Sequence, residues 1–317
     1  MVSSIEERLL PSPEPLVAIV GPTAVGKTAL SVALAHAFDG EIVNADSRQV
    51  YRGMDIGTGK PSPEQRALVP HHIIDVADPD EDFSLARYQD LAREAIAGIH
   101  QRGRAPLLVG GSGLYVWSVI EGLRLPRVAP DPAFRAHLER RAGTEGYLAL
   151  QRELQAVDPV AASRIDPRNV RRVIRALEVY HATGVPFSLA QRREAPPYRM
   201  LVLGLHCDRA ELYRRIDQRV DDMLAAGWLE EVRRLVGRGY GPDVPSMSSL
   251  GYRELVDCLS GRTSLADAVQ QIKRNTRRFA RRQYAWFRLA DPRITWLTLG
   301  DDLERKANAL VARFLRG

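Results

Sequence analysis

The sequence predicts an α/β fold, in which helices flank a parallel sheet and an inserted all-helical domain interrupts the core. Three observations support this class. Short apolar runs alternate with segments of helical spacing, as in chains that build parallel sheets. A glycine-rich motif stands between the first apolar run and the first helical segment. Prolines then bracket a long stretch that has helical patterning and no convincing strand.

The predicted elements follow from apolar runs and helical spacing. The predicted strands are 16–20, 41–45, 73–76, 106–109 and 201–205, with 294–299 either an edge strand or a loop. The predicted helices are 27–38, 84–101, 209–226, 229–238, 251–259 and 264–289. The predicted organisation is a flexible leader (1–15), a core with C-terminal helices (16–126 and 200–317) and a helical insertion (127–199).

Composition points to an anionic partner away from membranes. The net charge is +6, and segment 270–288 carries seven basic residues and no acidic one. Segment 131–199 adds twelve arginines against eight acidic residues. No apolar run is long enough to span a bilayer, and the N-terminus lacks a secretory pattern. The two cysteines fit neither a disulfide framework nor a zinc site, so we expect a cytoplasmic protein.

Residues 21–28 match the P-loop pattern in full, with a strand before and a helix after. The matching residues are Gly21, Pro22, Thr23, Ala24, Val25, Gly26, Lys27 and Thr28. Glycines let several N–H groups converge on one anion, lysine reaches phosphate oxygens, and the Thr28 hydroxyl can hold Mg²⁺. The fold is therefore predicted to be of the P-loop type. Asp75 is a weak Walker-B candidate and no base-recognition motif follows, so the bound diphosphate need not belong to a nucleotide.

Asp46 follows the second predicted strand, at the sheet edge where ligands bind in open α/β folds. A carboxylate there can hold Mg²⁺ through water or remove a proton from a nucleophile. Capping of the following turn explains it equally well. Ser112 and the glycine-rich loop 55–61 are predicted to lie near this edge, although ordinary turn chemistry also accounts for both. Only four of 45 basic residues are lysine, which suggests that Lys27 and Lys60 stand where a compact ammonium is needed.

The basic segment 270–288 has helical spacing. Its arginines at 274, 278, 281 and 288 share one face, and the apolar residues Ile272, Phe279 and Phe287 lie opposite, available for the core. A second basic turn spans 168–175. A solvated face is the ordinary explanation, but two uncompensated positive surfaces also suit a clamp on folded RNA.

The motifs together resemble the bacterial tRNA dimethylallyltransferase (tRNA isopentenyltransferase) family, from about Val17 to Trp296. The resembling stretches are GPTAVGKT (21–28), DSRQVYRGMDIGTGKP (46–61), HHIIDVADP (71–79), LLVGGSGLY (107–115), DPVAASRIDPRNVRRVIRALEVYHATG (158–184), RVDDMLAAGWLEEV (219–232), LGYRE (250–254) and RRFARRQYAWFR (277–288). Two departures are Ser112, where the family usually has threonine, and Gly59, where it usually has alanine. We expect Gly59 to make its loop more flexible.

The resemblance implies transfer of a dimethylallyl group from its diphosphate to N6 of the adenine next to the anticodon (position 37) of tRNA. It implies Asp46 as general base, with Thr23 and Arg219 also catalytic, residues 21–28 around the diphosphate, and Mg²⁺ on Thr28. The implied tRNA contacts are Asp46, Ser47, Arg48, Gln49, Ser112, Arg135, Arg171, Arg172, Val173, Ile174, Arg175, Ser248, Gly251, Tyr252, Arg253, Arg281, Arg282, Gln283 and Arg288. The implied partners are the tRNA anticodon stem-loop and dimethylallyl diphosphate, and we expect a monomer.

Three alternatives remain open from the sequence. An adenylate isopentenyltransferase would act on a free nucleotide and would need neither the insertion nor the basic helix. A P-loop kinase or ATPase would release the γ-phosphate of ATP. An RNA-binding protein with a relict P-loop would not need Lys27, Thr28 and Asp46 together.

Overall fold

The computed structural model describes residues 13–124, 126–193 and 198–317, which form two compact units. The core unit contains the chain up to Ile120 and from Pro197 onward, and the insertion is Glu121–Pro196. Both ends of the predicted insertion, 127–199, therefore lie a few residues C-terminal to the observed ends. Most of the predicted leader lies outside the described residues. Its last two positions, Glu14 and Pro15, already belong to the first strand.

The core unit is built on a six-stranded sheet whose strand pairs are all parallel, in the order β3-β2-β4-β1-β7-β8. The strands are β1 (Glu14–Val20), β2 (Gly40–Asn44), β3 (His71–His72), β4 (Ala105–Gly110), β7 (Tyr198–His206) and β8 (Ile294–Thr298). The predicted α/β class is confirmed, and the segment 294–299 is an edge strand rather than a loop.

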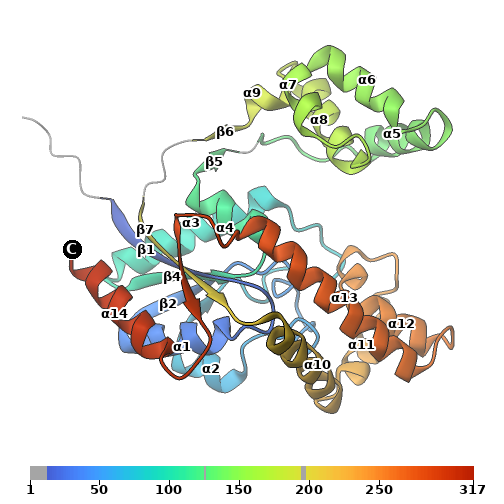
Figure 1. Cartoon of the computed structure of the whole chain (residues 1–317). Coiled ribbons are helices and arrows are strands. Elements are labelled where there is room, and N and C mark those ends of the chain that lie inside the picture. The colour runs from blue at the N-terminus through green and yellow to red at the C-terminus, as the bar shows by residue number, and fades with distance from the viewer. Residues whose placement is uncertain (1–12, 125, 194–197) are drawn as a thin grey trace, which may run out of the picture. The chain divides into compact units, whose positions relative to one another are not determined.

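Helices cover both faces of this sheet (Figure 1). One face packs against α1 (Lys27–Ala37) and α14 (Leu303–Arg316), and the other against α3 (Leu85–Gln101) and α4 (Gly113–Ile120). Successive residues of β1 serve the two faces in turn: Leu16, Ala18 and Val20 face one side, Val17 and Ile19 the other. Both faces of the central strands are buried, which explains why they read as continuous apolar runs.

Four helices follow the strand β7 and lie to one side in Figure 1. They are α10 (Arg209–Ala225), α11 (Trp228–Gly237), α12 (Tyr252–Leu259) and α13 (Leu265–Trp286), with a 3₁₀ turn at Pro245–Ser248 before α12. All four are predicted to within a few residues, because each begins at a capping residue or glycine and carries a clear apolar stripe.

The predicted strand 73–76 is wrong. The short strand β3 lies just before it, and Ile73 (φ 62°) and Asp75 (φ 58°) adopt left-handed conformations that a strand cannot contain. Asp75 pairs with Lys60 (2.5 Å) and Arg66 (2.8 Å), so it is not a Walker-B carboxylate. The short helix α2 (Pro63–Leu68), α4 and α14 have no counterpart among the predicted elements.

The insertion has a hydrophobic core of its own, in which Leu138, Leu150, Leu154 and Leu177 are buried. Its helices are α5 (Pro132–Thr144), α6 (Tyr147–Val157), α7 (Pro159–Arg164), α8 (Val170–Thr183) and α9 (Phe187–Ala190). It is not entirely helical, because β5 (Leu123–Arg124) and β6 (Arg192–Arg193) form a short antiparallel pair where the chain enters and leaves. The described part of the chain contains no helix both long and apolar enough to cross a membrane.

Candidate active site

The loop between β1 and α1 forms the turn that the P-loop pattern predicts. Gly21 has φ +140°, and a Cβ there would lie 2.5 Å from the carbonyl oxygen of Leu205, so only glycine fits. Gly26 (φ +96°) starts α1 without a side-chain cap, which leaves the first helical N–H groups available to an anion. The ammonium of Lys27 folds back onto the carbonyl oxygens of Gly21 (3.0 Å) and Pro22 (2.7 Å).

Two cations meet at this loop. Burial, helped by the nearby charge of Arg219 and opposed by that of Asp46, lowers the pKa of Lys27 to about 7. Burial likewise lowers the pKa of Arg219, which projects from α10 and has no ion-pair partner among the described residues. Two buried cations that share a single nearby carboxylate, Asp46, are the electrostatic signature of a site for an anion.

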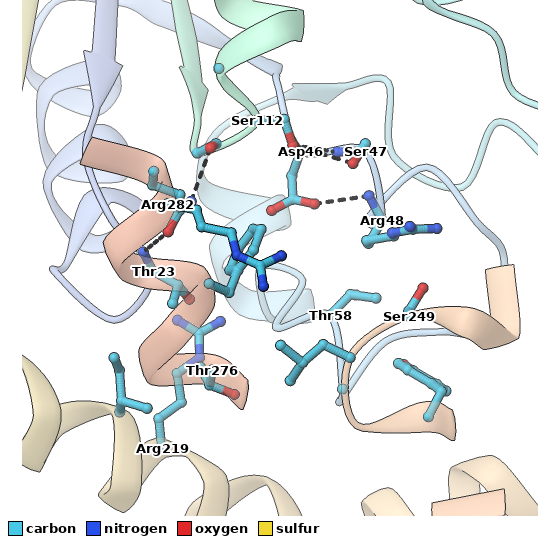
Figure 2. Close-up of a pocket in the computed structure, with 18 of the residues that line it drawn as sticks. Thr23, Asp46, Ser47, Arg48, Thr58, Ser112, Arg219, Ser249, Thr276 and Arg282 are labelled. Atoms are coloured by element: carbon cyan, nitrogen blue, oxygen red, sulfur yellow. Dashed lines mark hydrogen bonds between the residues drawn. The ribbon is translucent and has the colours of Figure 1, made fainter. Parts of the chain in front are cut away.

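Asp46 lies directly after β2, at the carboxyl edge of the sheet. Its Oδ1 accepts a hydrogen bond from the backbone N–H of Arg48 (2.8 Å). Asp46 therefore caps the following turn, as one of the two explanations from the sequence predicted. The other carboxylate oxygen points into the open pocket (Figure 2). The same turn that fixes the orientation of Asp46 therefore leaves one oxygen free to accept a proton.

Ser112 fastens the loop after β4 to the loop after β2. Its hydroxyl accepts the backbone N–H of Ser47 (3.0 Å) and lies 3.3 Å from the Ser47 hydroxyl, and its own N–H donates to Ala45. Gly110 allows this approach, because a Cβ there would lie 2.1 Å from the Ala45 carbonyl oxygen. Ser112 thus lines the pocket and also positions the residues beside Asp46.

Gln283 connects the basic helix α13 to the phosphate loop. Its Oε1 accepts the backbone N–H of Thr23 (2.8 Å), and its Nε2 donates to the carbonyl oxygen of Gly111 (2.9 Å). The side chain is 4% exposed. Both ends of the amide are engaged by protein backbone, which gives Gln283 a positioning role; the tRNA contact expected for it stays a prediction.

The glycine-rich loop 55–60 is held at both ends. The carboxylate of Glu231 on α11 accepts three backbone N–H groups, from Asp55 (2.9 Å), Ile56 (2.7 Å) and Gly57 (3.2 Å). The ammonium of Lys60 is 1% exposed and reaches Tyr51 O (2.6 Å), Asp55 (2.6 Å) and Asp75 (2.5 Å). Three acceptors around three N–H donors explain why lysine stands here in an arginine-rich chain.

Gly59 does not loosen this loop, contrary to expectation. Gln49 donates to the carbonyl oxygens of Thr58 (3.2 Å) and Gly59 (3.1 Å), which fixes the segment. Gly59 has φ +62°, and a Cβ there would lie 1.8 Å from a guanidinium nitrogen of Arg219. The glycine therefore makes room for the guanidinium of Arg219.

These parts surround one cavity of about 610 Å³ (Figure 2). Its polar side is lined by Thr23, Asp46, Ser47, Arg48, Ser112, Arg219, Arg282 and Gln283. Its apolar side is lined by Ile216, Val220, Met223, Trp228, Leu250, Tyr252, Phe279 and Trp286. A second, smaller cavity of about 80 Å³ brings Lys27 and Thr28 together with Asp46 and Gln49. Thr23, Arg219, a free carboxylate and an apolar wall thus share the large cavity, and Thr23, Asp46 and Arg219 also line the smaller one with Lys27 and Thr28.

The apolar wall is the part of the site that the sequence analysis missed. Phe279, predicted to serve the core, is instead 43% exposed at the pocket. Ile216, Val220 and Met223 recur at steps of four and three residues along α10, which is ordinary core spacing. Spacing shows that a face is apolar, and only the tertiary structure shows whether that face meets a helix or an empty pocket.

The charge of α13 is smaller than its sequence suggests. Two acidic residues of α10 reach it: Asp221 pairs with Lys273 (2.7 Å), and Asp217 pairs with Arg277. The expectation that nothing compensates this segment is therefore wrong for two of its seven cations. The exposed ones are Arg274, Arg278, Arg281, Arg282 and, just past the helix, Arg288.

Other predicted RNA contacts of the core unit lie around the same pocket. Ser248 lines it, and Arg253 is exposed on α12. Gly251 has φ +90° and starts α12. Tyr252 is fully buried and donates its hydroxyl to Glu231 (2.6 Å), so its side chain faces the cavity wall rather than the outer surface.

The predicted contacts of the insertion divide into surface and interior. Arg171 and Arg172 are exposed on α8, while Val173 and Ile174 are buried in the core of the insertion. Of these four residues, only Arg171 and Arg172 have side chains that RNA can reach.

Arg135 and Arg175 both bind the carboxylate of Glu178, which is 2% exposed. Burial alone would raise the pKa of Glu178, but hydrogen bonds from Arg135, the Asp131 backbone and Arg175 lower it to about 2. The two arginines thus hold the insertion together, and their tRNA contacts stay predictions.

The fold and the pocket define a P-loop protein in which buried cations lie near a free carboxylate and an apolar wall. Comparison of the sequence with protein-family models identifies the family within this class. Residues 49–290 match the family model described as IPP transferase, and residues 15–70 match one described as isopentenyl transferase. The chain belongs to the IPP transferase family.

Relatives of the chain are similar over nearly its whole length. A tRNA dimethylallyltransferase of Roseiflexus castenholzii is 59% identical over 297 residues, covering 94% of this chain and 97% of the relative. The crystal structure of a tRNA isopentenylpyrophosphate transferase from Bacillus halodurans has a TM-score of 0.71 at 45% identity, covering 96% of this chain and 97% of that one. A eukaryotic dimethylallyltransferase, whose structures show it acting on tRNA, has a TM-score of 0.79 at 28% identity, covering 96% and 80%.

Proposed function

We propose that this protein is a tRNA dimethylallyltransferase, which transfers a dimethylallyl group from dimethylallyl diphosphate to N6 of the adenine next to the anticodon (position 37) and releases diphosphate. The observation that carries the proposal is the shared cavity, in which Thr23 and Arg219, the free oxygen of Asp46 and an apolar wall face one space. The names of the relatives, and their similarity over nearly the full chain, support it.

The leaving group is stabilised by the phosphate loop. As the allylic C–O bond breaks, its electron pair goes to the diphosphate and positive charge develops on the five-carbon group. The N–H groups at the start of α1, the Lys27 ammonium and the Arg219 guanidinium stand where the new negative charge appears. Because these groups are already in place, little reorganisation accompanies bond cleavage.

The acceptor amine is activated by Asp46. The lone pair of an exocyclic adenine amine is delocalised into the ring, so the nitrogen is a poor nucleophile. As the new N–C bond forms, the free oxygen of Asp46 takes one N–H proton, and the product is a neutral secondary amine. Arg48 N–H holds the other oxygen at 2.8 Å and prevents the carboxylate from rotating away.

Magnesium fits the residues at the loop, provided that the diphosphate supplies most of its ligands. The described residues contain no group of three or more carboxylate, histidine or cysteine side chains that could hold a metal alone. Mg²⁺ commonly uses one protein hydroxyl or carboxylate together with phosphate oxygens and water. Thr28, with Asp46 on the same small cavity, would hold it, and the ion would add charge neutralisation to the leaving diphosphate.

RNA recognition is proposed for the exposed arginines. Arg278, Arg281, Arg282 and Arg288 belong to one stretch beside the cavity, and Arg282 lines its mouth. Phosphate contacts from such residues orient the RNA and make binding depend on salt. The adenine must leave its stack to reach Asp46, which costs a few kcal/mol and is offset by these contacts. We further propose that the protein acts as a monomer in the cytoplasm.

The direct test is incubation of the purified protein with unmodified tRNA, dimethylallyl diphosphate and Mg²⁺, followed by mass analysis of the nucleosides. We expect one adenosine per tRNA to gain one isoprene unit. Modification of free AMP in preference to tRNA would instead support an adenylate isopentenyltransferase. Hydrolysis of ATP with unchanged RNA mass would support a P-loop ATPase and overturn the proposal.

A further inference from the structure

We propose that Trp228 is the specificity-determining residue that limits the transferred isoprenoid to five carbons, by closing the apolar end of the cavity. This inference rests on the proposed function and adds a residue-level account of which donors the site accepts. It follows from the direction of the cavity, the packing of Trp228 and the unpaired N–H of its buried indole.

The direction of the cavity is set by α10. Ile216, Arg219, Val220 and Met223 line it from one face of this helix. Arg219 belongs to the diphosphate end, and Met223 lies one turn further on, a rise of about 6 Å. The helix ends at Ala225, and Trp228 begins α11 immediately beyond. Trp228 and Met223 both line the large cavity and not the smaller one around Lys27 and Thr28, which places them away from the phosphate loop.

That spacing suits a short chain. A dimethylallyl group spans roughly 5 Å at ordinary C–C bond lengths, and a geranyl group is about twice as long. The shorter group can lie alongside Val220 and Met223, which line the cavity together with Trp228. The longer group would have to displace whatever stands at the far wall.

Trp228 lies in a narrow space between two glycines, where the backbone comes close to its ring. A Cβ on Gly57 would lie 2.0 Å from its indole nitrogen, and a Cβ on Gly251 would lie 2.0 Å from its ring edge. Its ring is 2% exposed and meets Tyr252 edge-on, with centroids 5.8 Å apart. Two glycines from separate loops thus flank one indole, which cannot turn aside without a backbone shift.

Glu231, one helical turn after Trp228, prevents that backbone shift. Its carboxylate holds the N–H of Gly57 (3.2 Å) and the hydroxyl of Tyr252 (2.6 Å). Both neighbours of the indole are therefore tied to the helix that carries it. An end wall built in this way is rigid, and a rigid wall rejects a longer substrate by steric overlap.

The indole N–H gives the second argument. Trp228 Nε1 is buried without a hydrogen-bond partner within the described ranges of the chain. Buried polar groups are normally paired, so an unpaired one needs a reason. We infer that tryptophan is kept here, despite its unpaired N–H, because no other side chain fills as much space at the end of an apolar cavity.

The test is a competition between two donors. Dimethylallyl diphosphate and geranyl diphosphate are mixed in equal amounts with unmodified tRNA, and mass analysis counts adenosines that gain one or two isoprene units. We expect wild-type protein to favour the five-carbon group by at least about 100-fold. We expect Trp228→Ala to shift this ratio toward the ten-carbon group by about 100-fold, because the excluded volume is removed.

The matched control is Trp286→Ala, which removes an equally large ring from the same cavity. Trp286 is 47% exposed, so this change opens the mouth rather than the end. We expect its donor ratio to match the wild type even if its rate falls. Trp228→Leu serves as a second test variant if circular dichroism shows that the alanine variant is unfolded, and it should shift the ratio in the same direction by a smaller factor.

The outcomes separate the two hypotheses. Three results would overturn the assignment of Trp228 while leaving dimethylallyl transfer intact. They are equal use of both donors by the wild type, an unchanged donor ratio in both Trp228 variants, and an equal shift of the donor ratio in Trp286→Ala. Failure of the wild type to transfer either group would refute the proposed function, and the assignment of Trp228 with it.

Discussion

Lys27 and Lys60 show at the level of single residues why a lysine is kept in a chain with 45 basic residues of which only four are lysines. Lys60 directs its ammonium at three acceptors inside a tight loop. Lys27 folds onto two carbonyl oxygens at the start of a helix. A planar guanidinium would fit neither pocket, because its donors are spread over a larger fork.

The lowered pKa of Lys27 predicts proton uptake on diphosphate binding. Without ligand its pKa is about 7, so at pH 8 most of the ammonium is deprotonated. A bound diphosphate favours the charged form and raises the pKa, so binding at pH 8 should take up close to one proton, and binding at pH 6 almost none. Calorimetry in buffers of different ionisation enthalpy measures this uptake.

The control for this measurement is Lys27→Met, which cannot take up the proton. Its uptake at pH 8 should fall to that of the ligand alone. Equal uptake by the variant and the wild type would show that another group titrates.

Asp46→Asn tests the general base with little change of shape. Asparagine keeps an oxygen that can accept the Arg48 N–H bond, so the turn should survive. Because the amide cannot take the proton, kcat should fall by about 10² to 10⁴-fold. The dissociation constant for tRNA should stay within about threefold, because phosphate contacts dominate affinity. Rapid-quench turnover and filter binding measure the two quantities; parallel losses in both would remove Asp46 from the base role.

At the level of elements, α13 performs two tasks that its sequence does not separate. Its exposed arginines suit RNA, whereas Gln283 reaches the backbone of Thr23 and Gly111. One helix thereby joins the proposed RNA surface to the phosphate loop. Arg282 and Trp286, which are one helical turn apart on α13, both line the cavity.

Gln283→Ala should therefore impair the donor site rather than tRNA binding. The Thr23 N–H and the Gly111 carbonyl lose their partner, and we expect the KM for dimethylallyl diphosphate to rise by about tenfold. Steady-state kinetics with each substrate varied in turn measures the split.

The neighbouring Arg281→Ala is the matched comparison, because Arg281 is exposed on the same helix. It should leave the KM for dimethylallyl diphosphate unchanged and reduce the salt dependence of tRNA binding by about one unit of slope. If Gln283→Ala instead weakened tRNA binding alone, the positioning role would be wrong.

Elements with a local signal could be predicted, and contacts across the fold could not. The motif at 21–28 carries its own turn chemistry, so strand, loop and helix followed from it. The strand expected at 73–76 failed because Asp75 serves an ion pair with Lys60 and Arg66, which no local pattern reveals. The hydrogen bond from Thr23 to Gln283 spans 260 positions, and no local pattern reveals it either. Phe279 was misplaced because an apolar spacing does not distinguish a core from a pocket.

At the level of the whole molecule, each unit contains one buried carboxylate that gathers arginines. In the core unit a hydrogen bond from Arg102, helped by His72 and Arg104, lowers the pKa of Glu41 to about 2 against the cost of burial. In the insertion Glu178 plays the same part with Arg135 and Arg175. Both folded-state pKa values lie below the ordinary value of 4.5. Their stabilisation is therefore present above pH 4.5 and is lost as the pH falls from 4.5 toward 2.

Glu178→Gln and Glu41→Gln should each destabilise one unit by on the order of 2–3 kcal/mol at pH 7, and by much less near pH 2.5. All four tryptophans, Trp117, Trp228, Trp286 and Trp296, lie in the core unit, so tryptophan fluorescence reports on that unit alone. In urea titrations Glu41→Gln should shift the fluorescence transition. Glu178→Gln should shift part of the far-ultraviolet circular dichroism signal and leave fluorescence unchanged; a fluorescence shift of the same size would mean that the units unfold together.

The antiparallel pair of β5 and β6 has a consequence for how such enzymes diversify. Leu123 pairs with Arg193 and Arg124 with Arg192, so the chain departs and returns at neighbouring points. A module with adjoining ends can be deleted, swapped or enlarged without rethreading the strands that precede and follow it. The insertion can then change in length or sequence while the sheet and the pocket stay as they are.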